Sequence, residues 1–435
     1  MAPSAADGSG PLAQVCMLVI GIGYLFPISA IWAAFDYWKV LFPDSNIEFV
    51  VTGVYQVGSM VTVALITLFS TRGDLGKRIL GGFGGQFVCL GAILSFRWAA
   101  VENDELFYPL LLSVLLCSVA TGYLDSALFA VCSQYQNDMQ RFLQIGIGLG
   151  TMVSVFYRDL TKLIMSRDVA DATSLYFVVA LATVILCISC YRLLMRLEVS
   201  RHVKLSVGDA DVDSAAFATP PRSPMLSATS QYTSGTPLLG TPLLDEDQKP
   251  PRAAHHSGGA SPEFSVVFRL VWRQQMVIFL NLTLTTLCYP GMVTSIPCRQ
   301  FTFLEKDHWF QTLLLTAFTV ADIIGRIMTK YTFGLTYKSI HWTVVVRLFV
   351  SPAILLCIQS RALGDAVSFS VVMAFGFLNG YCVSLALIVP NEMKHLTENQ
   401  RKTCGFMSAC SVNSGLCAGS LLAAAAAVGL GLGGS

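Results

Sequence analysis

Two ionisable residues stand four positions apart in an otherwise apolar segment of the chain. The segment reads TAFTVADIIGRIMTK and carries Asp322 and Arg326. At this spacing both side chains lie on one face of an α-helix, where the guanidinium can neutralise the carboxylate. Gly325 beside them leaves room for a ligand or for a neighbouring helix. The pattern favours a buried binding and gating pair, and the alternative is a structural ion pair that fixes the rotation of the helix.

Two further ionisable residues interrupt apolar segments. Asp125, in TGYLDSALF, is a lone carboxylate. It has three interpretations: it accepts hydrogen bonds from a substrate, it titrates as a proton-coupling site, or it pairs with an arginine such as Arg347. Arg347 itself stands early in the segment VVRLFVSP. That position predicts either an interfacial anchor or an inner gate.

The composition indicates which elements must hold these residues. Hydrophobic residues make up 54% of the 435 residues, charged residues make up 13%, and the mean hydropathy is +0.61. Soluble domains carry about 25% charged residues, so this chain lacks the polar surface that water requires. Its apolar runs reach the length of about 20 residues with which a helix crosses a bilayer, whereas barrel strands give short alternating segments. We therefore expect an all-α polytopic membrane protein. An ionisable group at the centre of a membrane helix costs about 2.5 to 3.5 kcal/mol on insertion scales, which marks the residues above as functional candidates.

Eleven apolar runs are long enough to span a membrane, six before a polar gap and five after it. The predicted division is an N-terminal six-helix half over 1–196, a loop over 197–265 and a C-terminal five-helix half over 266–435. The predicted spans are 12–34, 49–70, 79–97, 107–131, 142–164, 174–193, 275–296, 309–330, 342–360, 366–389 and 404–429.

The loop over 197–265 is rich in Ser, Thr, Pro and Gly, which predicts disorder. Its Thr-Pro and Ser-Pro pairs at Thr219, Ser223, Thr236 and Thr241 are candidate sites of kinase action, and an unmodified linker is the alternative. Lys and Arg gather on the side of this loop, which places the loop and the N-terminus in the cytoplasm. Of the available membranes, the plasma membrane is favoured over an intracellular organelle.

Several features limit the class of function. Pro27, Pro290 and Pro352 stand inside predicted spans, where they indicate kinks that often line transport paths. The thirteen cysteines form no CxxC pair and no cluster with His, so we expect helix packing and no metal site. Neither a nucleophile elbow nor a nucleotide-hydrolysing motif is present. The chain has no basic, aromatic-rich patch for a nucleic-acid polymer. These observations predict neither an enzyme nor a cofactor.

Four segments in register resemble motifs of the equilibrative nucleoside transporter family. The first span, GIGYLFPISAIWAAFDYWKVLFP, is similar to that family's opening signature through residues that include Gly21, Gly23 and Pro27. DIIGR resembles its DxxGR motif, and VVRLFVSP resembles its RxxxxP motif. FGFLNGYCVSLAL is similar to its tenth-helix motif through Asn379 and Tyr381. The details look closest to plant-like and alga-like members.

The resemblance implies a major-facilitator-like bundle whose two halves rock around a central site. Members of the family carry nucleosides, and in some cases nucleobases, by facilitated diffusion or together with a proton. Asp322 and Arg326 match the family's substrate-contacting pair, and Asn379 falls in its tenth-helix motif. The expected partners are a nucleoside or nucleobase, membrane lipid and, for a coupled carrier, protons.

The departures from the family pattern affect the expected pocket. Ile28 and Ser29 stand where the family has Trp-Asn, and Trp32, one turn later, is the candidate replacement for the missing aromatic wall. The family's glutamine that contacts the base falls at Asp125, or at Leu124 if the alignment shifts by one residue. An ionised carboxylate at that place accepts hydrogen bonds but donates none. These departures leave two alternatives open: a carrier of another small polar solute, and a non-transporting sensor or receptor on the same fold.

Overall fold

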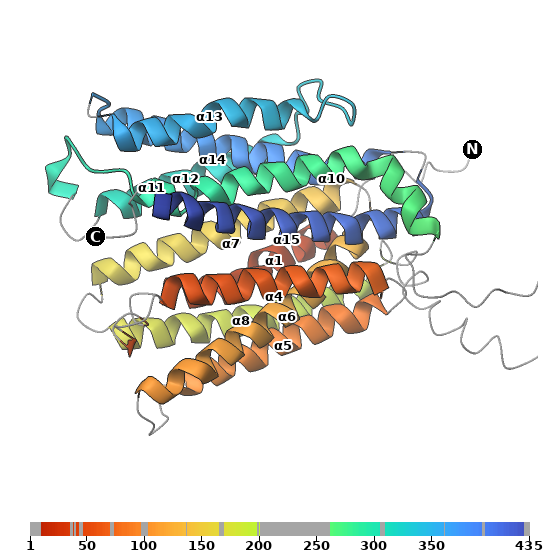
Figure 1. Ribbon diagram of the computed structural model, residues 1–435. Helices are drawn as coiled ribbons and strands as arrows, with labels where there is room; N and C mark the ends of the chain where they lie inside the picture. Colours follow the sequence, from red (N-terminus) through yellow and green to blue (C-terminus); the bar gives the residue numbers. More distant parts are fainter. Residues whose placement is uncertain are drawn as a thin grey trace, which may run out of the picture.

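The computed structural model describes residues 10–34, 38, 41–42, 47–69, 74–96, 103–135, 137–164, 169–197, 200, 262–304, 309–360, 362–393 and 396–429. Every regular element in these ranges is helical, as Figure 1 shows. The predicted loop over 197–265, with its candidate phosphorylation sites, lies almost entirely outside the described residues, since only Leu197, Ser200 and 262–265 of it are included.

Each of the eleven predicted spans corresponds to a helix or to a broken helix. Their bounds are α1 Pro11–Tyr24 with α2 Phe26–Ala33, α4 Ile47–Phe69, α5 Leu75–Ser95, α6 Phe107–Cys132, α7 Asn137–Ile164, α8 Val169–Arg196, α10 Pro262–Cys288 with α11 Gly291–Thr294, α12 Trp309–Met328, α13 Trp342–Gln359, α14 Asp365–Ile388 and α15 Glu398–Gly429. Short 3₁₀ turns at Asn103–Leu106, Thr302–Leu304 and Val389–Glu392 complete the described elements.

Ten of these segments are long and apolar enough to cross a membrane. The segment that falls short is α7, which has 28 residues but carries charged side chains at both ends, among them Asp138, Arg141 and Arg158. Gln144 and three glycines reduce its hydropathy further. A helix with polar residues at this depth is stable only where protein rather than lipid surrounds those residues. The position of α7 among the other helices meets this condition.

Prolines break two of the predicted spans. The first span is not one continuous helix, because α1 ends at Tyr24 and α2 begins at Phe26. Pro27 lies in the first turn of α2, where its missing N–H disturbs no helical hydrogen bond. The seventh span is divided in the same way before α11, with Pro290 as the residue that precedes the new helix. Pro352, by contrast, lies inside the continuous helix α13.

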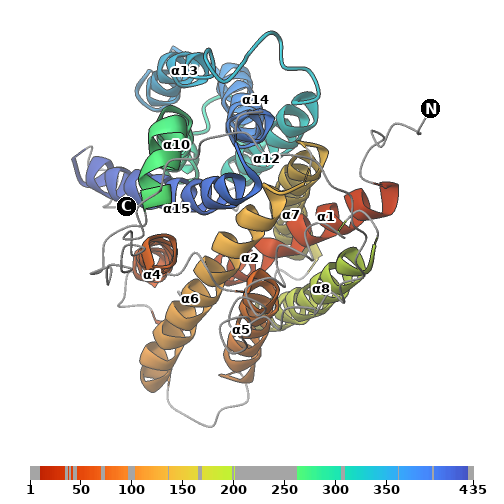
Figure 2. The same cartoon turned by 90° about the vertical axis from the view of Figure 1, so that its right-hand side faces the viewer.

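The helices gather into two sets that follow their order in the sequence. The N-terminal set, α1 to α8, and the C-terminal set, α10 to α15, run side by side with roughly parallel axes (Figure 1). The end-on view in Figure 2 shows α7 next to α12, and α15 close to α4 and α6. These contacts between α7 and α12, and between α15 and the pair α4 and α6, join the two sets.

Glycines allow the closest helix contacts. Gly376 and Gly380 lie one turn apart on α14, and a Cβ at either position would collide with the α12 backbone at Phe318 or Asp322. Gly325 of α12 is equally close to the carbonyl oxygen of Phe377. Small residues at this spacing permit close backbone approach in membrane bundles. The sequence predicted that Gly325 leaves room for a ligand or for a neighbouring helix. In the structure the neighbouring helix α14 fills this space.

The outer surface of the described helices is apolar. Large side chains such as Phe349, Val88 and Leu163 are 79%, 69% and 68% exposed, respectively. Exposed apolar area of this extent is unfavourable in water and suits contact with lipid. Of the thirteen cysteines, all unpaired, ten are buried and three are partly buried, so none faces the surface fully.

Candidate functional site

Asp322 and Arg326 form a buried ion pair on α12. The Arg326 Nε donates to Asp322 Oδ2 across 2.7 Å, and the two side chains are only 9% and 6% exposed. The spacing of four residues places both groups one above the other on the same face of the helix. An ion pair this far from water is retained only when its remaining donors and acceptors find partners. The neighbouring helices supply those partners.

A chain of hydrogen bonds continues from Asp322 into α14 and α10. The Asn379 Nδ2 donates to Asp322 Oδ1 across 2.6 Å, and the Thr285 hydroxyl donates to Asn379 Oδ1 across 2.6 Å. The Arg347 Nη2 of α13 in turn donates to the Thr285 hydroxyl at 2.8 Å. We call this chain from Arg347 through Thr285 and Asn379 to Asp322 the polar relay. It connects four helices through side chains that are all less than 10% exposed.

The structure places Arg347 in the interior of the bundle and not at an interface with water. Its side chain is 0% exposed, and its guanidinium lies over the Phe375 ring at 5.0 Å from the centroid. The Arg347 Nη1 donates to the carbonyl oxygen of Asn281 at 2.7 Å. Of the two roles predicted from the sequence, the interfacial anchor does not fit this buried position. The pairing of Arg347 with Asp125 is also not found among the described contacts, because Arg347 is engaged by α10.

Arg326 also joins the two helix sets. Its Nη1 donates to Gln144 Oε1 at 2.9 Å and to the Gln144 carbonyl oxygen at 3.2 Å. Gly148, one turn further along α7, lies directly against the Arg326 side chain, where a Cβ would be 2.6 Å from Cδ. A larger residue at 148 would displace the guanidinium. The α7 helix thus leaves room for Arg326 and provides a hydrogen-bond acceptor for it.

Asp125 lies at a second junction between the sets. The Asn413 Nδ2 of α15 donates to Asp125 Oδ2 at 2.9 Å, and the Ser59 hydroxyl of α4 donates to Asn413 Oδ1 at 2.7 Å. Tyr24, the last residue of α1, lies beside the same carboxyl. Asp125 is 2% exposed. Arg326 and Asp125 therefore each form a hydrogen bond with the opposite helix set.

The remaining expected residues near the first span have different surroundings. The Trp32 ring meets the Tyr55 ring edge to face at 6.2 Å. Its indole N–H is buried and has no hydrogen-bond partner among the described residues. The Ser29 hydroxyl of α2 donates at 3.0 Å to the carbonyl oxygen of Leu25, the residue that precedes the helix. The backbone N–H of Ser29 donates to the same carbonyl oxygen at 3.1 Å, so the Ser29 hydroxyl has a local partner in this conformation.

Two motif residues of α14 hold helices together. Asn379 has both ends of its amide engaged in the polar relay. The Tyr381 hydroxyl donates to the carbonyl oxygen of Tyr331 at 2.9 Å, which ties α14 to the segment just after α12. Their roles in substrate contact and gating stay predictions, since both side chains have protein partners in this conformation.

Several residues of the site are not among those predicted from the sequence. Gln144 and Asn413 are single uncharged polar side chains, which no charge and no motif marks in the sequence. Asn281 and Thr285 are four residues apart, as are Thr121 and Asp125. A search for polar pairs at this spacing within apolar spans would have found both sets, because the spacing places them on one helix face.

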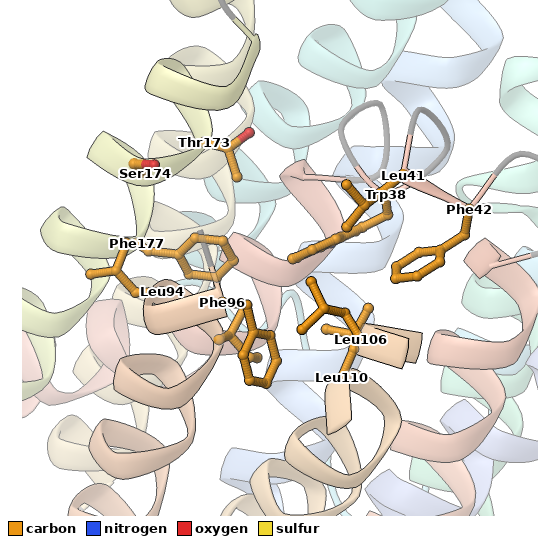
Figure 3. A pocket seen from close by; sticks show the side chains of 11 residues that line it. Trp38, Leu41, Phe42, Leu94, Phe96, Leu106, Leu110, Thr173, Ser174 and Phe177 are labelled. Atoms are coloured by element: carbon orange, nitrogen blue, oxygen red, sulfur yellow. The ribbon is translucent and has the colours of Figure 1, made fainter. Parts of the chain in front are cut away.

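A pocket lies away from these polar clusters. It opens among α5, α6, α8 and the segment after α2, and its walls are mostly aromatic and aliphatic (Figure 3). Thr173 and Ser174 contribute its hydroxyl groups, and Trp38, Phe42 and Phe177 line it from the other sides. None of its lining residues belongs to the C-terminal set. The pocket is consequently separate from the junction of the two sets.

Comparison with solved structures shows the fold class. The chain is similar to a bound form of the proton:xylose symporter XylE, with a TM-score of 0.58 and 9% identity over 97% of this chain and 89% of that one. It is also similar to a bacterial homologue of the iron transporter ferroportin, with a TM-score of 0.57 and 12% identity over 96% and 92% of the two chains. The protein therefore has a major-facilitator-like fold.

Comparison of the amino-acid sequence with known families and proteins shows the family within this fold class. Residues 111–427 match the family model described as nucleoside transporter. The chain is 22% identical over 398 residues to equilibrative nucleotide transporter 8 of Arabidopsis thaliana, covering 89% of this chain and 88% of the relative. It is also 22% identical over 459 residues to equilibrative nucleoside transporter 4 of Homo sapiens, covering 94% and 81% of the two. With the motifs and the fold in agreement, the chain belongs to the nucleoside transporter family, as a relative of its equilibrative members.

Proposed function

We propose that this protein carries nucleosides, nucleobases or both across a membrane by alternating access, with Asp322 and Arg326 as the centre of the substrate site. The observation that supports this proposal is the position of Arg326. Its guanidinium is held by Asp322 of its own helix and donates to Gln144 of the opposite helix set. A carrier needs a site that both halves share, so that each conformation opens it to one side of the membrane. Arg326 has this position.

The chemistry of the pair suits a nucleoside. A guanidinium has five N–H donors in a planar fork and no acceptor. Ribose hydroxyls and the carbonyl and ring-nitrogen acceptors of a base can replace Gln144 as its partners when the two sets separate. Asp322 keeps the guanidinium oriented, because it accepts from Nε and leaves the outer N–H groups for the ligand. The names of the relatives, which are nucleoside and nucleotide transporters, support this substrate class over another polar solute.

The proposed mode is facilitated diffusion or transport together with a proton. The sequence contains no nucleotide-hydrolysing motif, which speaks against a pump driven by nucleotide hydrolysis. Asp125 is the group through which a proton could be coupled, since it is a carboxylate at the other junction between the sets. We further propose a cytoplasmic N-terminus and a place in the plasma membrane. The distribution of basic residues supports the orientation.

Uptake in cells that lack their own carriers tests the proposal. Labelled adenosine, uridine and adenine are supplied at pH 5.5 and 7.5 to cells that express the wild type or Arg326→Ala. Saturable uptake that the substitution abolishes is the expected result. Equal uptake at the two pH values supports facilitated diffusion, and faster uptake at pH 5.5 that Asp125→Asn removes would establish proton coupling instead.

The control variant is Arg141→Ala. Arg141 pairs with Asp138 at 2.7 Å, but this pair is 22% and 42% exposed at the start of α7. Losing a partly exposed pair at the end of a helix should change stability by about 1 kcal/mol, so uptake should stay near the wild-type level. If Arg326→Ala reaches the cell surface and transports as well as Arg141→Ala does, the proposed site is refuted.

A further inference from the structure

The segment that connects α12 to α13 carries basic side chains and no acidic one. Residues 329–341 read TKYTFGLTYKSIH and contain Lys330, Lys338 and His341, all of which are exposed. We call this segment the α12–α13 loop. Neither of its lysines forms a salt bridge with a carboxylate of the described residues. The positive charge of the loop is therefore available to an anionic partner.

Four aromatic side chains lie in this loop or directly after it. Phe333 is 72% exposed, Tyr331 and Trp342 are each 56% exposed, and Tyr337 is 44% exposed. The Lys338 Nζ lies 5.8 Å from the centroid of the Tyr337 ring, so a cation and a ring are presented together. A group of large exposed rings is unfavourable in water, whereas aromatic residues gather at the headgroup level of a bilayer. The combination of rings and cations indicates contact with lipid headgroups.

The backbone of the loop holds Phe333 outward in a strained conformation. Phe333 has a φ of +48° and Gly334 has a φ of +75°. The N–H of Leu335 donates to the carbonyl oxygen of Thr332 at 2.9 Å, which closes a turn around these two residues. Turns with positive φ at both central positions favour Gly, Asn and Asp, and a bulky residue there costs free energy. No other non-glycine residue in the described part of the chain has a positive φ. A strained and exposed ring suggests a partner outside the chain.

The loop lies at the end of the bundle where α1 begins. Eight spans precede it, so the chain has returned to its starting side where α12 ends, as can be followed in Figure 1. With the N-terminus in the cytoplasm, as proposed above, the loop faces the cytoplasmic leaflet. That leaflet contains the anionic phospholipids that attract basic segments next to membrane helices.

We propose that the α12–α13 loop binds the headgroups of anionic phospholipids. Lys330 and Lys338 meet the phosphate groups, and the ring of Phe333 is inserted at headgroup depth. The inference goes beyond the proposed function, since it uses the proposed orientation of the chain and not the identity of the substrate.

Contacts inside the protein connect the loop to α14 and back to α12. The carbonyl oxygen of Tyr331 accepts from the Tyr381 hydroxyl at 2.9 Å, and the Phe333 ring lies 6.0 Å from the Tyr381 ring. The backbone of Tyr381 in turn lies directly against Gly325, the neighbour of Arg326. A headgroup held by the loop would stabilise this contact between α12 and α14. We therefore expect anionic lipid to raise the melting temperature of the protein.

Thermal unfolding of the purified full-length protein in detergent measures the binding. Short-chain phosphatidylserine, phosphatidylglycerol or phosphatidylcholine is titrated, and the shift of the melting temperature with concentration gives an apparent affinity. The two anionic lipids should bind at least tenfold more tightly than phosphatidylcholine, and more weakly as the salt concentration rises. Inorganic phosphate at the same concentrations should give no shift, because it lacks the acyl chains that place a headgroup beside the rings.

Substitution of the two lysines tests the charge. One lysine near an anionic surface changes affinity by roughly fivefold, so Lys330→Gln together with Lys338→Gln should weaken phosphatidylserine binding by about 25-fold. The control is Lys77→Gln. Lys77 is also exposed and begins a helix at the same end of the bundle, but it already pairs with Asp74 at 3.3 Å. This variant should bind like the wild type.

Phe333→Asn tests the ring without disturbing the turn, because asparagine tolerates a positive φ. The melting temperature without lipid should stay the same or rise, while the affinity for phosphatidylserine should fall by about tenfold. A variant that unfolds earlier without lipid and keeps its lipid affinity would show that the ring serves the fold, and would overturn the inference.

The outcomes separate this inference from the proposed function. Equal affinities for phosphatidylserine and phosphatidylcholine, or wild-type binding by the double lysine variant, would overturn the lipid site and leave the carrier assignment untouched. An equal shift by inorganic phosphate would identify a site for free anions and would also overturn it. Failure of every nucleoside and nucleobase to cross would remove the proposed function, while the lipid titration would still decide this inference.

Discussion

Replacing Thr285 with valine should disconnect the polar relay while changing the side-chain volume little. The hydroxyl accepts from Arg347 Nη2 at 2.8 Å and donates to Asn379 Oδ1 at 2.6 Å. Valine has the same branched shape and forms neither bond. Arg347 would then have a buried N–H without an acceptor, and Asn379 would be held only by its bond to Asp322.

The magnitude follows from the two lost bonds. A hydrogen bond to a charged group contributes about 1.5 to 3 kcal/mol, and one between neutral groups contributes about 0.5 to 1.5 kcal/mol. We expect Thr285→Val to lower the free energy of unfolding by about 2 to 4 kcal/mol. Because Asn379 positions Asp322, and Asp322 positions Arg326, we also expect the KM for nucleoside uptake to rise by roughly fivefold, which is about 1 kcal/mol.

Thr286→Val is the matched control. Thr286 is the next residue of the same helix, and its hydroxyl donates to the Leu282 carbonyl oxygen at 3.0 Å within the helix. Thermal unfolding of the purified protein and uptake kinetics in cells would be measured for both variants. Equal melting temperatures and equal KM values for the two would refute the relay. A double-mutant cycle with Arg347→Met should give a coupling energy of about 0.5 to 3 kcal/mol.

Two other predictions test the packing that holds the site. Gly380→Ala should abolish folded protein at the membrane, because a Cβ there would overlap the Asp322 carbonyl oxygen. Fluorescence-detected size-exclusion chromatography of a tagged protein measures the amount of folded protein. The control is Gly84→Ala, which should be neutral because a Cβ at Gly84 would have no atom within 4 Å. Asp365→Asn should lower the melting temperature, since this carboxylate accepts from the backbone N–H groups of Arg299, Gln300 and Phe301 at 2.7 to 3.1 Å. A carboxamide has only one oxygen that can accept from these N–H groups, so the free energy of unfolding should fall by about 2 kcal/mol. An unchanged melting temperature would show that the loop before α12 does not depend on Asp365.

The sequence was sufficient to predict most of the architecture. Runs of apolar residues give the positions of the spans, because a membrane helix must satisfy all its backbone groups internally and cover them with apolar side chains. The spacing of Asp322 and Arg326 likewise predicts their ion pair, since partners four residues apart meet on any α-helix. The break at Pro27 was predictable in kind, as a kink, but its extent was not. Whether a proline bends a helix or ends it depends on which neighbouring groups satisfy the freed carbonyl oxygens.

What the sequence by itself determined about this protein was its class, its spans and the ion pair within a single helix. Only the tertiary structure decided the partners of those residues: Gln144 for Arg326, Asn413 for Asp125, and Thr285 for Arg347. Each of these contacts joins residues 62 to 288 positions apart in the chain. Helical periodicity specifies which side chains share a face of one helix, but it says nothing about which face of another helix packs against it. That choice depends on close packing, and here on glycines such as Gly325 and Gly380, whose missing side chains let two backbones touch.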